Sequence, residues 1–217
     1  MNDNFISFDF NCEAVVVGNG DYPTSNIAIS FLRKSRLMVC CDGAADNMIR
    51  TGYMPDLIIG DGDSISAENK VKYKDIICIN LDQETNDQTK AVEYLAGKGY
   101  ERIAIIGATG KREDHTLGNI SLLMEYHKKG IYVRMYTDYG MFVPVRGSAV
   151  FDFPVGSSVS VFGFGTIGMS SDGLKYPIRD FSALWQGTLN VVEKSPFVIK
   201  ADGNYMVYVC YSESLQV

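Results

Sequence analysis

Two aspartates two positions apart mark the stretch GDGDSIS, residues 60–66, which directly follows the apolar run DLII. Asp61 and Asp63 carry like charges, so their proximity requires either a solvated turn or a cation held between them. Carboxylate oxygens are the ligands that Mg²⁺ and Ca²⁺ prefer in proteins. Taken alone, this stretch indicates either an ordinary surface turn or a divalent-cation site.

Aspartate recurs after each of five apolar runs in the first half of the chain. The loops that follow these runs read GNGDYP, CDGAADN, GDGDSIS, LDQETNDQTK and GATGKREDH. Because Asp and Gly form turns, chance explains any single loop at least as well as a binding site does. The joint pattern is more specific, since an acidic cluster without matching lysines requires a cation. The carboxylates concerned are Asp42, Asp61, Asp63, Asp87 and Asp114.

The stretch KREDH, residues 111–115, combines a guanidinium, a carboxylate and an imidazole. Arg112 is suited to phosphate, while Asp114 and His115 lie at a predicted junction between a strand and a helix. A charged surface loop explains this stretch equally well. GNGDYP lacks the spacing of a dinucleotide fingerprint and GATGKR is not a Walker A loop, so neither supports nucleotide binding by itself. Zinc is not expected, because the chain has two histidines and no Cys/His spacing that fits.

Short apolar runs alternate with longer amphipathic segments up to about residue 137, which predicts strands and helices in turn. The predicted strands are 12–18, 36–40, 56–60, 75–80, 102–107 and 131–137, and the predicted helices are 24–34, 43–52, 86–99 and 116–130. Strands that are apolar on both faces and separated by helices form a parallel sheet covered on both sides. In such a sheet ligands bind beyond the carboxyl ends of the strands, where the aspartate loops lie.

The helical periodicity stops after about residue 140. The remaining chain consists of short, often alternating apolar runs separated by Gly, Ser, Asp and Pro, which is typical of an antiparallel sandwich or barrel. The predicted strands of this part are 148–153, 158–165, 173–178, 188–192, 197–201 and 205–211. The change of period predicts a domain boundary in the stretch 137–147. We therefore expect an α/β domain over residues 1–140 and an all-β domain over residues 141–217.

Composition places the chain among ordinary globular proteins. Of its 217 residues 46% are apolar and 21% charged, and the net charge is −6. No basic run is longer than two residues, so we expect no nucleic-acid partner. The five cysteines form no CxxC motif, and the sequence contains neither a signal-peptide pattern nor a membrane-spanning apolar stretch. We therefore expect reduced thiols and a cytoplasmic location.

Taken in order, the loops resemble those of the thiamine pyrophosphokinase family, whose members transfer a pyrophosphoryl group from ATP to thiamine. The matching stretches are DGAADN at 42–47, PDLIIGDGDS at 55–64, NDQTKA at 86–91 and GATGKREDHTLGN at 107–119, with fainter matches GLKYPI at 173–178 and GTLN at 187–190. Their order and spacing agree over most of the chain, which is far more specific than any one loop.

The resemblance implies an N-terminal α/β parallel-sheet domain followed by an all-β sandwich, a homodimer, and Mg²⁺ acting with ATP. As Mg²⁺ ligands it implies Asp61, Asp63 and Asp87, which with Arg112 are the expected catalytic residues. For ATP it implies Asp42, Gly43, Ser64, Gly107, Thr109, Arg112, Asp114 and His115. For thiamine it implies Gln83, Tyr176, Thr188 and Asn190.

Two positions depart from the family pattern. Gly62 stands where the family usually has an aromatic residue between the two aspartates, and Asn86 stands where it usually has threonine. Both changes leave the carboxylates intact, so they bear on substrate fit and loop rigidity. Alternative functions are a hydroxymethylpterin pyrophosphokinase of the same chemistry, a non-catalytic nucleotide- or Mg²⁺-binding module, and a hydrolase of nucleoside phosphates.

Overall fold

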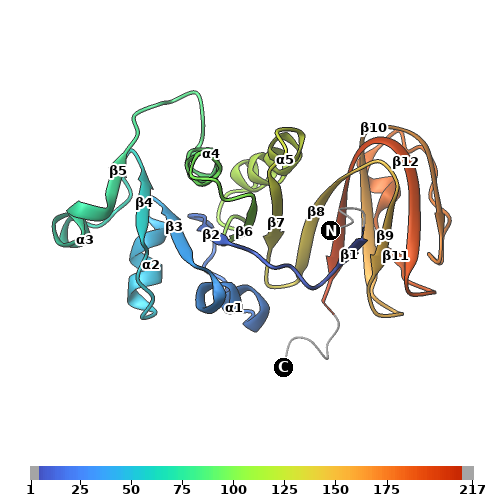
Figure 1. Ribbon diagram of the computed structural model, residues 1–217, viewed down its shortest axis with the longest axis horizontal. Coiled ribbons are helices and arrows are strands. Elements are labelled where there is room, and N and C mark those ends of the chain that lie inside the picture. Colours follow the sequence, from blue (N-terminus) through green and yellow to red (C-terminus); the bar gives the residue numbers. More distant parts are fainter. Residues whose placement is uncertain (1–4, 212–217) are drawn as a thin grey trace. The chain divides into compact units, whose positions relative to one another are not determined.

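The computed structural model describes residues 5–211, and their contacts divide the chain into two compact units. We call Cys12–Asp138 the α/β unit; the β unit consists of the described residues up to Asn11 and those from Tyr139 onward. Both units appear in Figure 1. The division differs from the predicted one at the N-terminus, because residues 5–11 belong to the β unit.

A parallel sheet of six strands forms the centre of the α/β unit. Its strands are β2 (Ala14–Val17), β3 (Leu37–Cys41), β4 (Leu57–Gly60), β5 (Ile77–Ile79), β6 (Arg102–Ile106) and β7 (Tyr132–Tyr136), as predicted. The spatial order is β7-β6-β2-β3-β4-β5, so the direction of winding reverses between β2 and β6. The side chains of β2 are fully buried, as expected for a strand covered on both faces.

Helices cover both faces of this sheet, with α1 (Asn26–Lys34) and α2 (Ala44–Arg50) on one side and α4 (Asp87–Gly97) and α5 (Glu113–Lys128) on the other (Figure 1). The short helix α3 (Ala67–Lys72) and the 3₁₀ turn η1 (Lys74–Ile76) connect β4 to β5 and were not predicted. Asn86 begins α4 by accepting a hydrogen bond from Thr89 N at 2.9 Å. This departure from the family pattern therefore still caps the helix.

Two long strands, β10 (Ser158–Asp172) and β12 (Phe197–Cys210), organise the β unit by pairing along most of their length (Figure 1). On its other edge β12 pairs with β9 (Ala149–Asp152) through its first residues and with β8 (Gly140–Arg146) through its last. β1 (Phe5–Ser7) pairs in parallel with β9, and β11 (Asn190–Val191) pairs with β10. The 3₁₀ turn η2 (Leu184–Gly187) follows β10 along the chain.

The β unit is all-β as predicted, but several strands were assigned wrongly. β10 was predicted to end at Gly165 but continues to Asp172. The register of its pairing with β12 shifts near Gly165 and Gly168, where φ is +81° and +69°, and the strand continues past both glycines. The predicted strands 197–201 and 205–211 are one strand, β12. The stretch 173–178 forms a single bridge, from Leu174 to Val192, instead of a strand.

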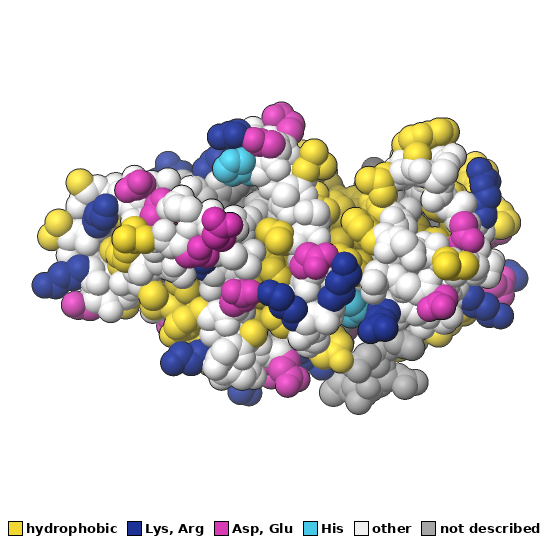
Figure 2. Space-filling model, turned by 90° about the horizontal axis from the view of Figure 1, so that it is seen from above, with side chains coloured by type: hydrophobic (Ala, Val, Ile, Leu, Met, Phe, Trp, Pro, Cys, Tyr) yellow, Lys and Arg dark blue, Asp and Glu magenta, His cyan; other side chains and the backbone are white. Residues whose placement is uncertain are grey.

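Surface charges are mixed on the face drawn in Figure 2. Lys and Arg side chains stand singly or in small groups among Asp and Glu, without a continuous basic surface. That face lacks the electrostatic footprint of a nucleic-acid-binding protein. Within residues 5–211 no helix combines the length and the apolar character needed to cross a membrane.

Candidate active site

A cavity of about 550 Å³ lies at the carboxyl ends of the parallel strands, lined by the loops that follow β2, β3, β4, β5 and β6. Two of these loops, after β2 and β6, flank the point where the winding of the sheet reverses. That point is where doubly wound sheets bind ligands, and the volume suits a small molecule of nucleotide size. The predicted residues that line the cavity are Asp42, Asp61, Ser64, Gln83, Asp87, Arg112 and His115.

Asp42, which follows β3 and lines the cavity, has a constrained backbone conformation. Its φ is +42°, in the left-handed region, and it is only 3% exposed. Oδ2 accepts a hydrogen bond from Ser64 N at 2.9 Å, whereas Oδ1 is buried and has no hydrogen-bond partner. Burial raises the pKa of Asp42, and the negative charges of Asp87 and Asp61 raise it further. An unpartnered carboxylate oxygen among other carboxylates is suited to accept a cation.

Gly60 allows two of these carboxylates to approach the backbone. A Cβ atom at this position would lie 2.8 Å from Cβ of Asp42 and 3.2 Å from Oδ2 of Asp87. Any larger residue would push the two side chains apart. At Gly62 glycine is favoured by the backbone conformation, because φ is +80°, which residues with a side chain rarely adopt. The loop that carries Asp61 and Asp63 therefore turns through a glycine where the family has an aromatic residue.

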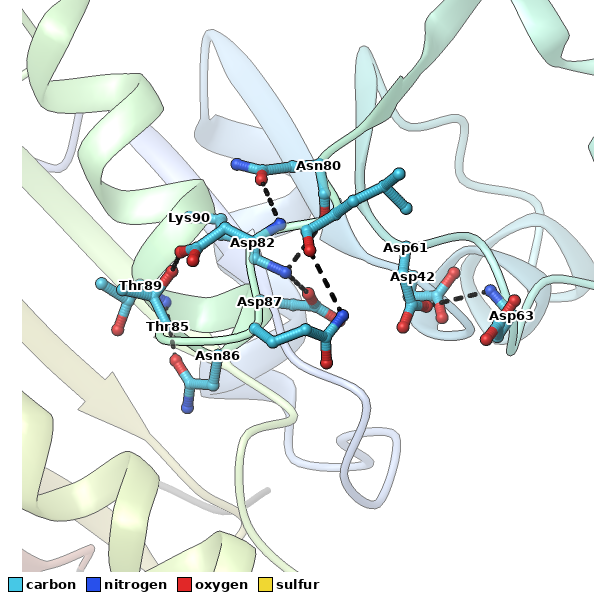
Figure 3. Close-up of polar contacts among 12 residues, drawn as sticks. Asp42, Asp61, Asp63, Asn80, Asp82, Thr85, Asn86, Asp87, Thr89 and Lys90 are labelled. Atoms are coloured by element: carbon cyan, nitrogen blue, oxygen red, sulfur yellow. Dashed lines mark hydrogen bonds and ion pairs between the residues drawn. The ribbon is translucent and has the colours of Figure 1, made fainter.

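Asp61 and Asp63, the two aspartates of the stretch GDGDSIS, lie in different surroundings. Asp61 lines the cavity, and its Oδ1 accepts a hydrogen bond from Asp63 N at 3.0 Å. Asp63 is exposed and lies further out on the loop, away from Asp42 and Asp61 (Figure 3). Across the part of the chain that the structure describes, no three carboxylate, imidazole or thiol side chains form a complete metal site. The structure therefore does not bring Asp61, Asp63 and Asp87 together as one set of ligands.

Lys90 contradicts the expectation that the acidic cluster has no matching lysine. Its side chain is 5% exposed, and its Nζ donates to Asp87 Oδ1 at 3.1 Å and to the carbonyl of Asn80 at 3.1 Å (Figure 3). Lys90 follows Asp87 by three positions, so both side chains project from the same side of α4. The buried ammonium holds Asp87 against the loop that follows β5.

Asp46 connects α2 to the loop that carries Asp61 and Asp63. Its Oδ1 accepts from Ser66 Oγ at 2.9 Å and from Asn69 Nδ2 at 2.7 Å, and its Oδ2 accepts from Ser66 N at 2.9 Å. Although burial opposes ionisation, these hydrogen bonds from Asn69 and Ser66 hold the pKa of Asp46 below its usual value. Asp46 therefore fixes the far end of that loop, where Ser66 caps α3.

The loop between β6 and α5 and the first turn of α5 form another wall of the cavity. Arg112 and His115 line the cavity, and Arg112 forms an ion pair with the exposed Asp114, whose pKa it lowers. Gly107 and Thr109 shape this wall through their carbonyls, which accept hydrogen bonds from Gly20 N at 2.7 Å and Asp21 N at 2.8 Å.

The residues predicted to contact thiamine belong to different units. Gln83 lines the cavity of the α/β unit, whereas Tyr176, Thr188 and Asn190 lie in the β unit. Asn190 is buried and ties two segments together, because its Oδ1 accepts from Tyr176 N and its Nδ2 donates to Tyr176 O at 2.6 Å. Thr188 donates to the carbonyl of Trp185 at 2.7 Å, and the Tyr176 side chain is 56% exposed.

Other residues that line the cavity were not identified from the sequence, among them Asn19, Lys90, Lys111 and Asn119. Gly43, which was predicted to contact ATP, packs against Asn19 and Ser64 and does not line the cavity. The signal for Asn19 was present, because GNGDYP ends a predicted strand. It was not used, because the motif matches no phosphate-binding fingerprint.

Fold and cavity together define an α/β protein that binds its ligand at the switch point of a parallel sheet. A family model described as Thiamin pyrophosphokinase, catalytic domain, matches residues 29–135, and one described as Thiamin pyrophosphokinase, substrate-binding domain, matches residues 140–208. The chain belongs to the thiamine pyrophosphokinase family of enzymes.

Individual thiamine pyrophosphokinases are similar to this chain in sequence or in structure. Thiamine pyrophosphokinase 1 of Oryza sativa subsp. japonica is 29% identical over 226 residues, covering 88% of this chain and 84% of that protein. Thiamine pyrophosphokinase of Bacillus subtilis is 32% identical over 103 residues, covering 46% of this chain and 48% of that protein. The crystallised thiamin pyrophosphokinase from Candida albicans has the same fold, with a TM-score of 0.78 at 19% identity, covering 96% of this chain and 93% of that one.

Proposed function

We propose that this enzyme transfers the pyrophosphoryl group of ATP to the hydroxyl of thiamine, giving thiamine diphosphate and AMP. Family membership supports the reaction class. The observation that carries the proposal is the convergence of Asp42, Asp61 and Asp87 on a nucleotide-sized cavity that Arg112 also lines. Phosphoryl-type transfer depends on positioning and charge neutralisation, and this arrangement supplies groups for both.

The acidic side of the cavity fits Mg²⁺. The buried, unpartnered Oδ1 of Asp42 and the neighbouring carboxylates form an oxygen-only donor set, which suits a hard divalent cation. We propose Asp61, Asp63 and Asp87 as its ligands, with Asp42 beside them as a ligand or a nucleotide contact. Bound Mg²⁺ would supply positive charge that neutralises the phosphates and offsets the charge that develops on the leaving group.

The side chains of the enzyme orient the two substrates. In the proposed reaction the thiamine oxygen forms a bond to the β-phosphorus of ATP, the bond from that phosphorus to the α–β bridging oxygen breaks, and AMP carries that oxygen away. Arg112 binds phosphate oxygens, with Asp114 and His115 on the nucleotide side. The backbone of Gly107–Thr109 and the start of α5 favour binding of the negatively charged polyphosphate of ATP. Lys90 and Asn80 hold Asp87 in place for the reaction.

For thiamine we propose four contacts, each of which belongs to one of the two units. Gln83 offers an amide to the aminopyrimidine, and Tyr176, Thr188 and Asn190 are the proposed contributions of the β unit. A homodimer accounts for the exposed apolar side chains Leu184 and Trp185 of η2, since such groups often mark an interface. We also propose a cytoplasmic location, which is supported by five cysteines that are all free.

Phosphorus NMR of the purified protein with ATP, Mg²⁺ and thiamine tests the function against a control without thiamine. Thiamine diphosphate and AMP should appear in equal amounts, and only when thiamine is present. Asp87→Asn should abolish both, whereas the matched variant Asp75→Asn, at an exposed position outside the cavity, should not. Intact ATP would refute the thiamine reaction and make hydroxymethylpterin the next acceptor to test. AMP or ADP released without an acceptor would indicate hydrolysis.

A further inference from the structure

Lys111 has an unusual backbone conformation for a lysine. Its φ is +58°, in the left-handed region that favours glycine, and it follows Gly110, whose φ is +81°. A side chain in this conformation is strained unless the surrounding structure imposes it, and such residues cluster at ligand-binding sites. Lys111 lies at the exposed rim of the cavity and lines it.

The surrounding loops hold this conformation in place. The loop after β6 is joined to the loop after β2 by the two backbone hydrogen bonds from Gly20 and Asp21. Gly110 is enclosed so closely that a Cβ atom there would lie 2.1 Å from Oδ2 of Asp21. Lys111 is therefore placed by two loops that are fastened together at the switch point of the sheet.

The ammonium of Lys111 is directed by a neutral partner. Its Nζ donates to Oδ1 of Asn19 at 3.0 Å. Asn19 is itself confined, because its Nδ2 would lie 2.9 Å from a Cβ atom at Gly43. The amide fixes the direction of the lysine and leaves its positive charge uncompensated, since an amide oxygen carries no net charge.

Each of the other two lysine or arginine side chains that line the cavity has a carboxylate partner in the structure. Lys90 is paired with Asp87, and Arg112 is paired with Asp114. Among residues 5–211, Lys111 takes part in no ion pair. The Lys111 ammonium is thus held at the cavity by an amide and has no carboxylate partner. A cation in this position is suited to bind an anion that enters the cavity.

We propose that Lys111 is a phosphate-binding residue of this enzyme, contacting the polyphosphate chain of the nucleotide in the cavity that Asp42, Asp61 and Asp87 also line. Asn19 acts as its positioning residue. The inference rests on the proposed function, because it assigns the phosphates of ATP to a particular side chain. It predicts that Lys111 contributes to affinity in proportion to the number of phosphates and contributes nothing to the recognition of the nucleoside.

Calorimetric titration of adenosine, AMP, ADP and ATP into the wild type and Lys111→Met tests the proposal. The Kd for ATP should rise about tenfold, equivalent to ~1.4 kcal/mol. The rise should be smaller for ADP and AMP and absent for adenosine, and it should shrink at high salt. Lys74→Met removes an exposed lysine outside the cavity and should leave every Kd unchanged. Lys111→Arg should retain most of the affinity.

Lys111→Gly separates the charge from the backbone. Glycine adopts the positive φ without strain, so this variant should lose ATP affinity as Lys111→Met does while its thermal midpoint is no lower than that of the wild type. Equal ATP affinity in all variants would overturn the proposal while the NMR assay still forms thiamine diphosphate. Loss of adenosine affinity to the same extent would also overturn it, because the loop would then have a purely structural role. A wild type that binds no ATP and forms no product would refute the proposed function itself.

Discussion

Replacing Lys90 by methionine should destabilise the ligand-free protein far more than the same change at an exposed lysine. Methionine keeps most of the buried stem but removes the charge, so Asp87 loses its ion-pair partner and the Asn80 carbonyl loses its donor. Breaking a buried pair by removing one partner costs about 3–5 kcal/mol. The Asp87 side chain is 31% exposed and can be partly solvated, whereas that of Lys90 is 5% exposed. We therefore expect a loss of about 2–3 kcal/mol.

Urea unfolding followed by circular dichroism measures this loss. Lys129→Met is the matched control, because Lys129 pairs with Glu93 at 2.6 Å but both side chains are about half exposed, and it should cost less than ~1 kcal/mol. The double variant Asp87→Asn with Lys90→Met should recover much of the stability, since it leaves no unpaired charge. The reasoning fails if Lys90→Met costs no more than Lys129→Met, or if the double variant is as unstable as the two single losses combined.

Three other changes test the supports of the site. Asp138 accepts hydrogen bonds from Thr24 and Ser25 at the start of α1, and although burial opposes ionisation these bonds lower its pKa, so Asp138→Asn should cost about 1–2 kcal/mol at pH 7. A lowered pKa stabilises the fold above the unfolded-state value of about 3.9, so this difference should disappear as the pH falls below it. Gly60→Ala should displace Asp42 and reduce turnover at least about tenfold, measured as thiamine diphosphate formed. Asp46→Ala should raise the Mg²⁺ concentration for half-maximal activity severalfold, and Asp46→Asn should do so less.

Each of these changes has a distinct contrary result. If Asp138→Asn lowered the free energy of unfolding as much at pH 2 as at pH 7, the ionised form of Asp138 would not be what stabilises the start of α1. Full turnover by Gly60→Ala would show that the carboxylates do not depend on their approach to this backbone. An identical Mg²⁺ dependence in Asp46→Ala and the wild type would show that the loop holds its shape without the hydrogen bonds to α2.

The parallel sheet could be predicted because its strands are short and apolar on both faces. Val15 and Ile105 each lie in uninterrupted apolar runs, and aspartate and glycine end those runs where the cavity forms. The helix α3 could not be predicted in this way, because none of its residues is buried and it has no apolar periodicity. Its position depends on Asp46 and Ser66, a contact across the fold that no local pattern indicates.

In the β unit, glycine misled the strand assignment. Gly165 and Gly203 have φ values of +81° and +103°, so each resembles a turn in sequence while the strand continues through it. In the cavity, the carboxylates were predictable from their loops, but their counter-charges were not. Lys90 was indistinguishable from any surface lysine of a helix, and only the packing of α4 against the sheet shows that it is buried.

The pairing of β1 with β9 has a consequence for synthesis. The ribosome makes Phe5–Ser7 first, but Val150, the partner of Phe5, emerges only after the whole α/β unit has been translated. The α/β unit, which is continuous in sequence, can fold while the nascent chain grows, whereas the first strand must wait for its neighbour. The α/β unit is thus a domain inserted between two parts of the other. A substitution in Phe5–Ser7 would therefore act on the β unit, although the α/β unit follows this strand in the sequence.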